Sequence, residues 1–321
     1  MLFRPRSDSP DDVAWTTADA ALIDEARVLL GPRRRPRPAR AETTILDGID
    51  LDAYRADVRA AALREAARLA ASASAERDEA EFVTYGHIVV DEAQDLSPME
   101  LRVLRRRDLT GSMTIVGDMA QATTASSPAS WAATISLLEP RRAPTRVDLT
   151  VSYRTPEEVL SFAAPTLAAA APDVAAPRPV RRGGTVPIVE RVDASEFAAR
   201  LVSATRREID AVAPGRVAVI VTAARVEEII GILVAGGLAA VDPRDESSRG
   251  LGADLVVLAA EGANGLEFDA VVVVDPCEIA TRESADGGVT PRGLRTLYVA
   301  MTRPTRRLAI VAAGPLPATI L

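Results

Sequence analysis

Two stretches of the sequence, Leu255–Leu258 and Val271–Val274, are apolar at every position. A strand that is apolar on both faces has to be covered on both faces, as parallel sheets are between layers of helices. Together with these two stretches, apolar runs typical of strands lie at 87–91, 112–117, 146–151, 186–191, 216–222, 254–259, 270–275 and 307–312, the two stretches falling within 254–259 and 270–275. Segments with helical periodicity alternate with them, at 98–107, 129–138, 156–170, 194–212, 225–236 and 291–303. This βαβ alternation predicts an α/β fold built on parallel sheets with helices on both faces.

The N-terminal part of the chain has a different composition. Residues 17–30 are expected to form a helix with Thr17 as its N-cap, and 31–40 form a linker rich in proline and arginine. That linker is read as a solvated connector, with contact to phosphate as the alternative. Residues 50–80 are expected to form a long helix, and a second connector is expected at 172–184.

The charge of the chain limits its partners. The net charge is −7, so a globally basic nucleic-acid binder is excluded, and contact with a polyanion has to come from local patches. All 38 basic residues are arginine, so the chain has no lysine to serve a phosphate-binding loop.

Compartment is indicated by cysteine usage and by apolar segments. One cysteine, Cys277, excludes an internal disulfide and fits a reducing cytoplasm. The N-terminus shows no apolar segment typical of a secretory signal, and the alanine-rich stretch 163–176 is interrupted by prolines. We therefore expect a cytoplasmic protein without a membrane span.

Adjacent carboxylates at the end of a strand carry the strongest chemical signal. The run His87–Val90 leads directly into Asp91 and Glu92. Phosphoryl transfer to water needs a bound metal and a group that orients the attacking water, and two neighbouring acids at a strand end can serve both needs. The alternative is an ordinary surface Asp-Glu pair, which the preceding strand and the following Ala-Gln-Asp make a poor description.

Two further polar groups follow strands. Gly117 and Asp118 end one strand, and Gln121 then presents an amide that can bond both a phosphate oxygen and a water. Tyr153 and Arg154 follow the next strand; arginine can stabilise a transferring phosphoryl group, and a tyrosine ring can stack on a nucleobase. An ion-paired surface role for Arg154 remains open on this tetrapeptide alone.

Two groups in the last third complete the set. The segment Glu261–Asp269 lies between two buried strands, where Gly265 suits close backbone approach and Glu267 can accept from a ribose hydroxyl. The helix 291–303 ends in Arg303, a second arginine suited to phosphate.

In this order, the groups DEAQD, GDMAQ, YRT, GLEFD and YVAMTRP resemble motifs II to VI of superfamily 1 helicases of the UvrD/Rep type. The segments HIVVDEAQDLSPM and GSMTIVGDMAQAT are most similar to the HelD-like branch, whose members associate with bacterial RNA polymerase. The resemblance covers residues 80–312 and implies two RecA-like domains of the P-loop NTPase fold. Its C-terminal portion is represented here, without the phosphate-binding loop.

The resemblance also implies roles and cofactors, namely ATP and Mg²⁺. Asp91 would ligate the metal, Glu92 would activate water, and Gln121 would sense the γ-phosphate. Arg154 and Arg303 would act as arginine fingers. The nucleoside would lie against Tyr153, Gly265 and Glu267.

The domain limits that follow are a helical and linker region at 1–80, a partial first RecA-like domain at 81–145, and a second RecA-like domain at 146–321. The usual lysine before Gly265 is Asn264, and the aromatic residue expected soon after Gln121 is absent until Trp131, which is read as a core residue. His87 is expected to be structural, and Arg105–Arg107 to be a solvated run.

Two functions fit these observations. The first is an ATPase fragment of a helicase, inactive alone and completed by an upstream segment or a partner that carries the phosphate loop. The second is a non-catalytic module that binds RNA polymerase or DNA. An in-frame GxxGxGK[ST] upstream of Met1 would favour the first function, and its absence would favour the second.

Overall fold

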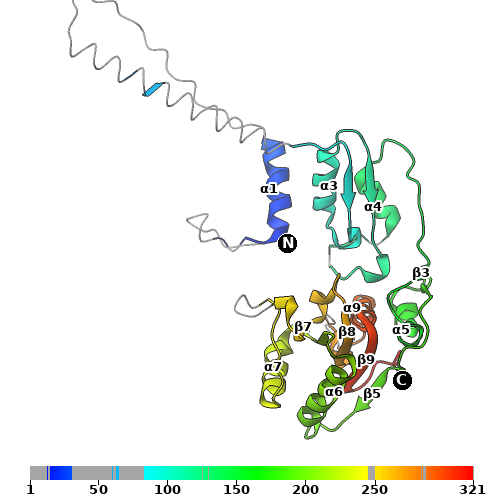
Figure 1. Cartoon of the computed structure of the whole chain (residues 1–321). Helices are drawn as coiled ribbons and strands as arrows, with labels where there is room; N and C mark the ends of the chain where they lie inside the picture. Colours follow the sequence, from blue (N-terminus) through cyan, green and yellow to red (C-terminus); the bar gives the residue numbers. More distant parts are fainter. Residues whose placement is uncertain are drawn as a thin grey trace, which may run out of the picture. The chain divides into compact units, whose positions relative to one another are not determined.

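The structure is a computed structural model, and it describes residues 13, 15–30, 60, 63–64, 83–124, 126–128, 130–244, 250–282, 284 and 287–320. The predicted linker 31–40 and almost all of the predicted helix 50–80 lie outside these residues. The chain divides into two compact units (Figure 1). The first comprises 1–90, 97–115 and 135–142, and the second comprises 91–96, 116–134 and 143–321.

The first unit contains a short parallel strand pair and two packed helices. Strand β1 (Ile88–Val90) pairs in parallel with β2 (Met113–Ile115). Helix α3 (Pro98–Arg107) occupies the predicted range, because Ser97 and Glu100 form a capping box at its start. Helix α1 (Thr17–Leu30) packs on α3. Helix α4 (Trp131–Leu138) spans the boundary between the units.

Ion pairs between α1 and α3 correct one prediction. Arg106 bonds the carboxylates of Asp24 and Glu25, and Arg107 bonds Asp24 at 2.7 Å. The reading of 105–107 as a solvated run is therefore wrong for these two arginines, because α1 brings acids that helical periodicity could not place. His87 is exposed and bonds the hydroxyls of Ser112 at 2.7 Å and Thr114 at 3.1 Å.

The second unit is organised around a five-stranded sheet in which every pairing is parallel, in the order β5-β9-β8-β6-β7. Its strands are β5 (Ile188–Arg191), β6 (Val217–Val221), β7 (Leu255–Ala259), β8 (Phe268–Val274) and β9 (Pro304–Ala312). Strands β6 and β7 are buried at every residue, as apolar runs of this kind predict. The prediction of an α/β fold with a parallel sheet is confirmed for this unit.

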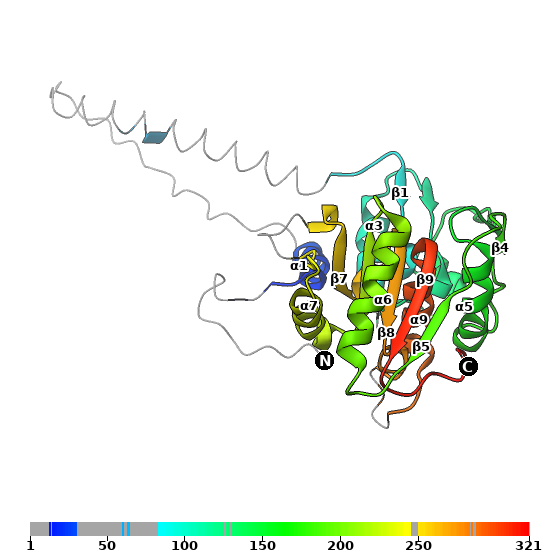
Figure 2. The same cartoon turned by 60° about the horizontal axis from the view of Figure 1, so that its bottom comes forward.

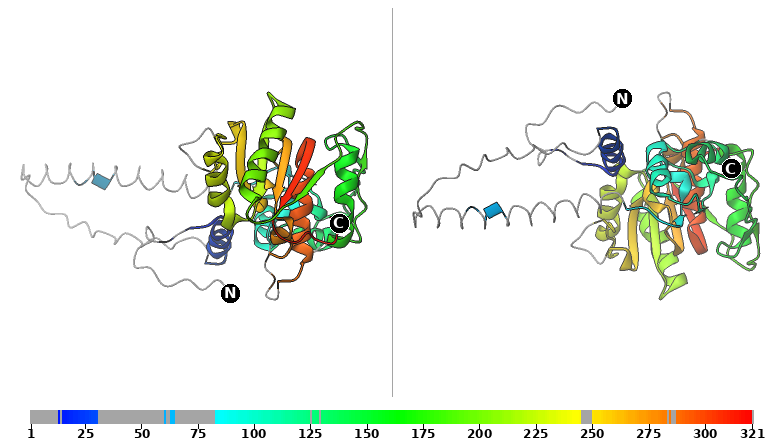
Figure 3. Two further views of the ribbon diagram at one scale, coloured as in Figure 1. Left: turned by 90° about the horizontal axis from the view of Figure 1, so that it is seen from below. Right: turned by 90° about the horizontal axis from the view of Figure 1, so that it is seen from above.

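Helices cover both faces of this sheet. One face packs against α6 (Phe197–Val212) and α7 (Val226–Ala235), as Figure 2 shows for α6 over β8 and β9. The other face packs against α5 (Glu157–Ala170), α8 (Pro276–Ala280) and α9 (Pro291–Thr302). In Figure 3 (left) the strands lie between α6 and the orange-red helices of the opposite layer. Helix α8 was not predicted from the sequence.

Several boundaries differ from the prediction. The strand expected at 146–151 reduces to β3 (Val151–Ser152), which pairs with β4 (Arg178–Pro179) in a separate two-stranded sheet. Residues 143–150 are exposed and carry no regular structure, because no described strand lies beside them. The predicted connector 172–184 supplies β4. Strands β8 and β9 begin earlier than expected because Phe268 pairs with Pro304.

The domain limits at 80 and 145 stay predictions. The residues that follow β1 and β2 belong to the second unit together with α9 and the segment before β8. Short 3₁₀ turns shape these segments, namely η2 (Ala93–Asp95), η3 (Met119–Gln121) and η6 (Ala260–Ala263). Among the described residues, no helix is long and apolar enough to span a bilayer.

Candidate functional site

The segment after β1 makes a strained turn at Glu92. This residue has φ 50° and ψ 40°, a left-handed conformation that is uncommon outside glycine, asparagine and aspartate. Such conformations cost on the order of 1–3 kcal/mol and persist where surrounding structure fixes them. The Glu92 amide donates to Asp91 Oδ1 at 2.9 Å, and Gln94 Nε2 donates to Glu92 Oε2 at 2.7 Å. Both acids are exposed, so both carboxylates are accessible to a ligand.

The segment after β2 is held by Asp118. Its Oδ1 accepts from the amide of Ala120 at 2.9 Å, which caps the turn η3. Its Oδ2 accepts from Gln121 Nε2 at 2.8 Å. The donor end of the Gln121 amide is therefore fixed, and its carbonyl end points away from Asp118.

Arg303, at the end of α9, meets that carbonyl. Its Nη2 donates to Gln121 Oε1 at 2.9 Å, and its Nε donates to the carbonyl of Val299 at 3.1 Å. The Arg303 carbonyl accepts from the amide of Phe268 at 3.2 Å, which places this residue where β8 and β9 begin. The sequence predicted Gln121 and Arg303 separately, and the structure brings them together.

The environment of Arg303 is unusual for a charged group. The residue is 4% exposed, and no carboxylate of the described residues lies within ion-pair distance of it. Burial lowers the pKa of Arg303, and the nearby positive charge of Arg154 lowers it further, while Glu92 and Glu267 act in the opposite direction. A buried cation of this kind is costly unless an anion accompanies it.

Arg154 and Glu267 form an ion pair beside this group. Arg154 Nη2 lies 2.6 Å from Glu267 Oε1, with side chains 52% and 40% exposed respectively. Arg181 Nη1 holds the local backbone, since it donates to the carbonyls of Arg154 at 3.1 Å and Thr305 at 2.7 Å. Tyr153 is 75% exposed, so its ring is accessible for stacking.

Gly265 brings its own segment close to the acid after β1. Its φ is +71°, a conformation that suits glycine, and a Cβ built there would lie 3.9 Å from Glu92 Oε1. The predicted residues Glu92, Gln121, Arg154, Gly265, Glu267 and Arg303 thus come from five segments of the second unit and lie in one region.

Some residues of this region were not assigned from the sequence. Asn264 Nδ2 donates to Asp95 Oδ2 at 3.1 Å and to Thr123 Oγ1 at 2.8 Å. Burial raises the pKa of Asp95, and Glu92 adds to that rise, although hydrogen bonds to Asp95 oppose it. Burial raises the pKa of the Tyr298 hydroxyl to about 12, and nearby Asp118 contributes to the rise. No sequence signal marks these contacts, because each joins distant segments.

A metal could be held here only with help from a ligand. Among the described residues, no group of three or more His, Cys, Asp or Glu side chains could bind a metal ion. Mg²⁺ in nucleotide sites usually takes one or two carboxylates together with phosphate oxygens and waters. The exposed carboxylate of Asp91 fits that limited requirement.

Trp131, which the sequence analysis interprets as a core residue, is half-buried.

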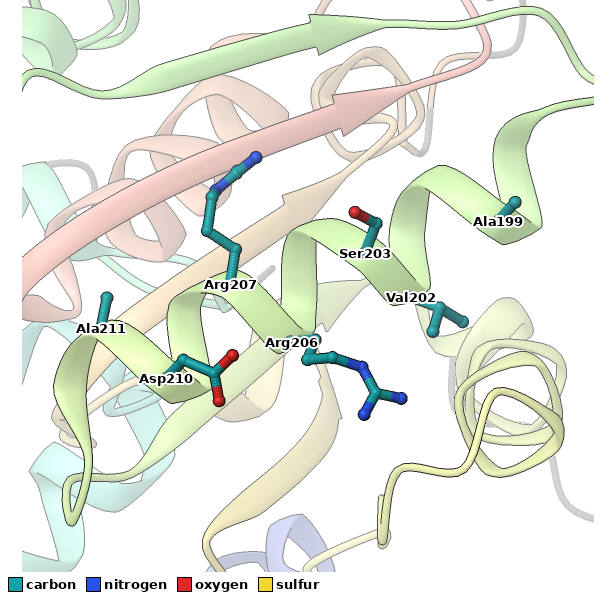
Figure 4. A pocket seen from close by; sticks show the side chains of 7 residues that line it. All are labelled: Ala199, Val202, Ser203, Arg206, Arg207, Asp210 and Ala211. Carbon is teal, nitrogen blue, oxygen red and sulfur yellow. The ribbon is translucent and has the colours of Figure 1, made fainter.

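A shallow surface pocket lies elsewhere, along the outer side of α6 (Figure 4). Its lining comes entirely from that helix, with Arg206, Arg207 and Asp210 as its charged members. None of the predicted site residues lines it. The chemistry indicated by the sequence therefore does not coincide with this pocket.

Comparisons with known proteins add little. No protein-family model and no curated protein matches the sequence. A solved structure of the C-terminal domain of a possible DNA helicase from Lactobacillus plantarum WCFS1 is similar, at 22% identity and a TM-score of 0.40. The match covers 53% of this chain and 92% of that domain. A similarity of this degree assigns neither fold nor function here.

Proposed function

We propose that this chain carries the acid, sensor and arginine parts of an ATP-hydrolysing site of the superfamily 1 helicase type. In this proposal it is the C-terminal portion of a UvrD/HelD-like protein. One observation carries the proposal: Arg303 is buried, bonds Gln121, and has no carboxylate of the described residues within ion-pair distance, although Glu92 and Glu267 lie near enough to act on its pKa. In this proposal the γ-phosphate of ATP is the counter-ion of Arg303, and a buried arginine stabilises the charge of such a phosphate strongly.

Each residue has a distinct task in this proposal. Glu92 orients the attacking water and accepts its proton, and Asp91 would hold Mg²⁺. Arg303 and Arg154 stabilise the negative charge that develops on the transferring phosphoryl group. Gln121 fixes the position of Arg303 through their hydrogen bond. When bound with the nucleotide, Mg²⁺ would neutralise part of the phosphate charge.

The nucleoside would lie over the exposed ring of Tyr153 and beside Gly265. Glu267 is placed to accept from a ribose hydroxyl, but it pairs with Arg154 at 2.6 Å. Since both side chains are about half exposed, this pair contributes only about 0–1 kcal/mol and can open when a nucleotide competes for Arg154.

The phosphate-binding loop has to come from outside this sequence, because the chain contains no lysine. A segment that precedes this sequence or a partner protein would supply it. The work coupled to hydrolysis would then be done on DNA or on RNA polymerase.

The alternative is a non-catalytic module that binds RNA polymerase or nucleic acid. One observation favours this module: Gln121 bonds Arg303, and Arg154 pairs with Glu267. These side chains already have partners within the chain and do not need a nucleotide to satisfy them. The two functions differ in whether the region responds to nucleotide.

Nuclear magnetic resonance of the ¹⁵N-labelled chain tests this difference. Titration with Mg²⁺ and ATP should shift the Arg303 Nε–H and the Gln121 side-chain amide signals, even if affinity is weak. Adenosine at equal concentration should shift neither signal, since it lacks phosphate. Arg178, exposed on β4, supplies a matched guanidinium whose signal should stay unchanged. Equal responses to ATP and adenosine, or no response at Arg303, would favour the non-catalytic module.

A further inference from the structure

Gln94 is a fully buried polar side chain, with 0% exposure, that bonds in two directions. Its Nε2 donates to Glu92 Oε2 at 2.7 Å. Its Oε1 accepts from the backbone amide of Asp118 at 2.9 Å. Both ends of one amide are thus used, one on the acid after β1 and the other on the segment after β2.

The side-chain amide of Gln94 lies close against the backbone of Gly117, which restricts its position. A Cβ built on Gly117 would lie 2.4 Å from Gln94 Oε1 and 3.1 Å from the backbone nitrogen of Ala93. Glycine at this position therefore follows from the presence of the Gln94 amide, and not from a positive φ. The amide of Ala93 also donates to the carbonyl of Val116 at 3.0 Å, which keeps the two segments together.

The bonds of Gln94 continue as far as Arg303. Glu92 accepts from Gln94, Gln94 accepts from the Asp118 amide, and the Asp118 carboxylate accepts from Gln121. Gln121 in turn accepts from Arg303. Along this series every side-chain amide donates at one end and accepts at the other, so a rotated amide would break two bonds at once.

We propose that Gln94 is a positioning residue that ties the orientation of the Glu92 carboxylate to the segment holding Gln121 and Arg303. Its catalytic meaning rests on the proposed function, whereas the physical link does not. Glu92 needs such support because its left-handed backbone is unfavourable and its carboxylate is otherwise exposed. One amide thereby sets the relative position of the acid and the guanidinium.

Two substitutions of Gln94 affect its two hydrogen bonds, to Glu92 and to Asp118, in different ways. Gln94→Met keeps the volume and removes both hydrogen bonds. Gln94→Glu keeps an acceptor for Asp118 but places a second carboxylate against Glu92. Adding Glu92→Gln to Gln94→Glu restores a hydrogen bond between the two side chains. Its direction is reversed, because the amide at position 92 now donates to the carboxylate at position 94.

The test uses the whole chain without nucleotide. Hydrogen exchange of the Asp118 amide should accelerate by about fivefold in Gln94→Met, since a hydrogen bond contributes about 1 kcal/mol. Exchange should also accelerate in Gln94→Glu, because repulsion by the Glu92 carboxylate displaces the new carboxylate from the Asp118 amide. It should return close to the parent rate in the double variant. The double variant keeps the proposal testable if Gln94→Met fails to fold.

A second measurement distinguishes a positioning role of Gln94 from a purely structural one. Glu92→Gln should shift the Gln121 side-chain amide signal in the parent, and the shift should fall by about threefold or more in the Gln94→Met background. Glu100→Gln, a neutralisation that the capping box of α3 tolerates, should leave Gln121 unchanged.

An equal response of Gln121 in both backgrounds, or no rescue by the double variant, would overturn the link. Failure of the nucleotide titration would instead overturn the proposed function alone. If coupling through Gln94 is found without a response to ATP, the link stands as part of a non-catalytic fold.

Discussion

The guanidinium of Arg303 donates to the side-chain carbonyl of Gln121 at 2.9 Å, although the two residues are 182 positions apart in the sequence. Arg303 is buried and has no described carboxylate as a partner, whereas its close neighbour Arg307 bonds the buried carboxylate of Glu208 at 2.6 Å. The two arginines therefore differ in what they contribute to stability and to function.

Substitution of these arginines should separate the two contributions. Arg307→Met should destabilise the chain by about 2 kcal/mol, because it leaves the buried Glu208 carboxylate with Arg207 as its remaining arginine partner. Arg303→Met should cost less than about 1 kcal/mol or even stabilise, because it removes a buried cation that has no described carboxylate within ion-pair distance. Denaturant titration of each variant measures both values. A loss of about 2 kcal/mol for Arg303→Met would identify Arg303 as a structural residue.

The chain by itself should not hydrolyse ATP at a measurable rate. The backbone amides and lysine of a phosphate loop supply much of the phosphate binding in such enzymes, and this sequence has no lysine. Release of phosphate by the purified chain should equal that of Glu92→Gln. A helicase-like rate that Glu92→Gln abolishes would contradict this prediction.

The ion pair of Arg154 with Glu267 should matter little for stability. Both side chains are about half exposed, so Arg154→Ala and Glu267→Ala should each change the free energy of unfolding by less than about 1 kcal/mol. Their ATP-induced signal changes should differ, because Arg154→Ala removes a phosphate ligand and Glu267→Ala frees one. Equal effects of both variants on the response to ATP would show that Arg154 serves only the pair.

Helix α1 should be released from α3 by acid. Burial would raise the pKa of Asp24, but hydrogen bonds from Arg106 and Arg107 outweigh it and hold that pKa below its ordinary value of 3.8. Because the folded-state pKa is the lower one, the stabilisation is present above pH 3.8 and is lost as the pH falls through the folded value. The protection of the α1 amides, corrected for the intrinsic exchange rate at each pH, should therefore fall below about pH 4.

At neutral pH, Arg106→Ala should raise exchange of the same amides by loosening α1, at a cost of about 1–2 kcal/mol. Arg142→Ala, in an exposed segment of the same unit, is the matched control and should have no effect. Unchanged exchange in Arg106→Ala would mean that apolar contacts alone hold α1.

Much of the fold follows from local patterns. The apolar runs at 254–259 and 270–275 form β7 and β8 in the parallel sheet, because strands covered on both faces must be apolar throughout. The strand expected at 146–151 almost disappears, since Val147 and Leu149 alternate like a strand but no strand of the described residues lies beside them. Alternation predicts an extended backbone and cannot predict a partner.

For the candidate site, the sequence indicated individual residues but not the contacts between them. Strand ends and residue types indicated Asp91, Glu92, Gln121, Arg154 and Arg303, and their roles stay predictions. Asp118 and Gln94 lie within the same segments but were assigned no role. Their importance comes from hydrogen bonds between segments that are distant in the sequence, and no periodicity records such bonds.

The most direct measurement is ATP turnover by the chain joined to a segment or partner that carries the phosphate-binding loop. Arg154→Ala and Arg303→Ala should each lower turnover by about 10³–10⁵-fold while nucleotide binding and the fold persist, as expected of arginine fingers. Arg178→Ala, an exposed arginine of the same unit, should leave turnover unchanged. If the Arg154 and Arg303 variants hydrolyse ATP as fast as the parent, these residues do not form half of a hydrolytic site, and the second unit is a binding module.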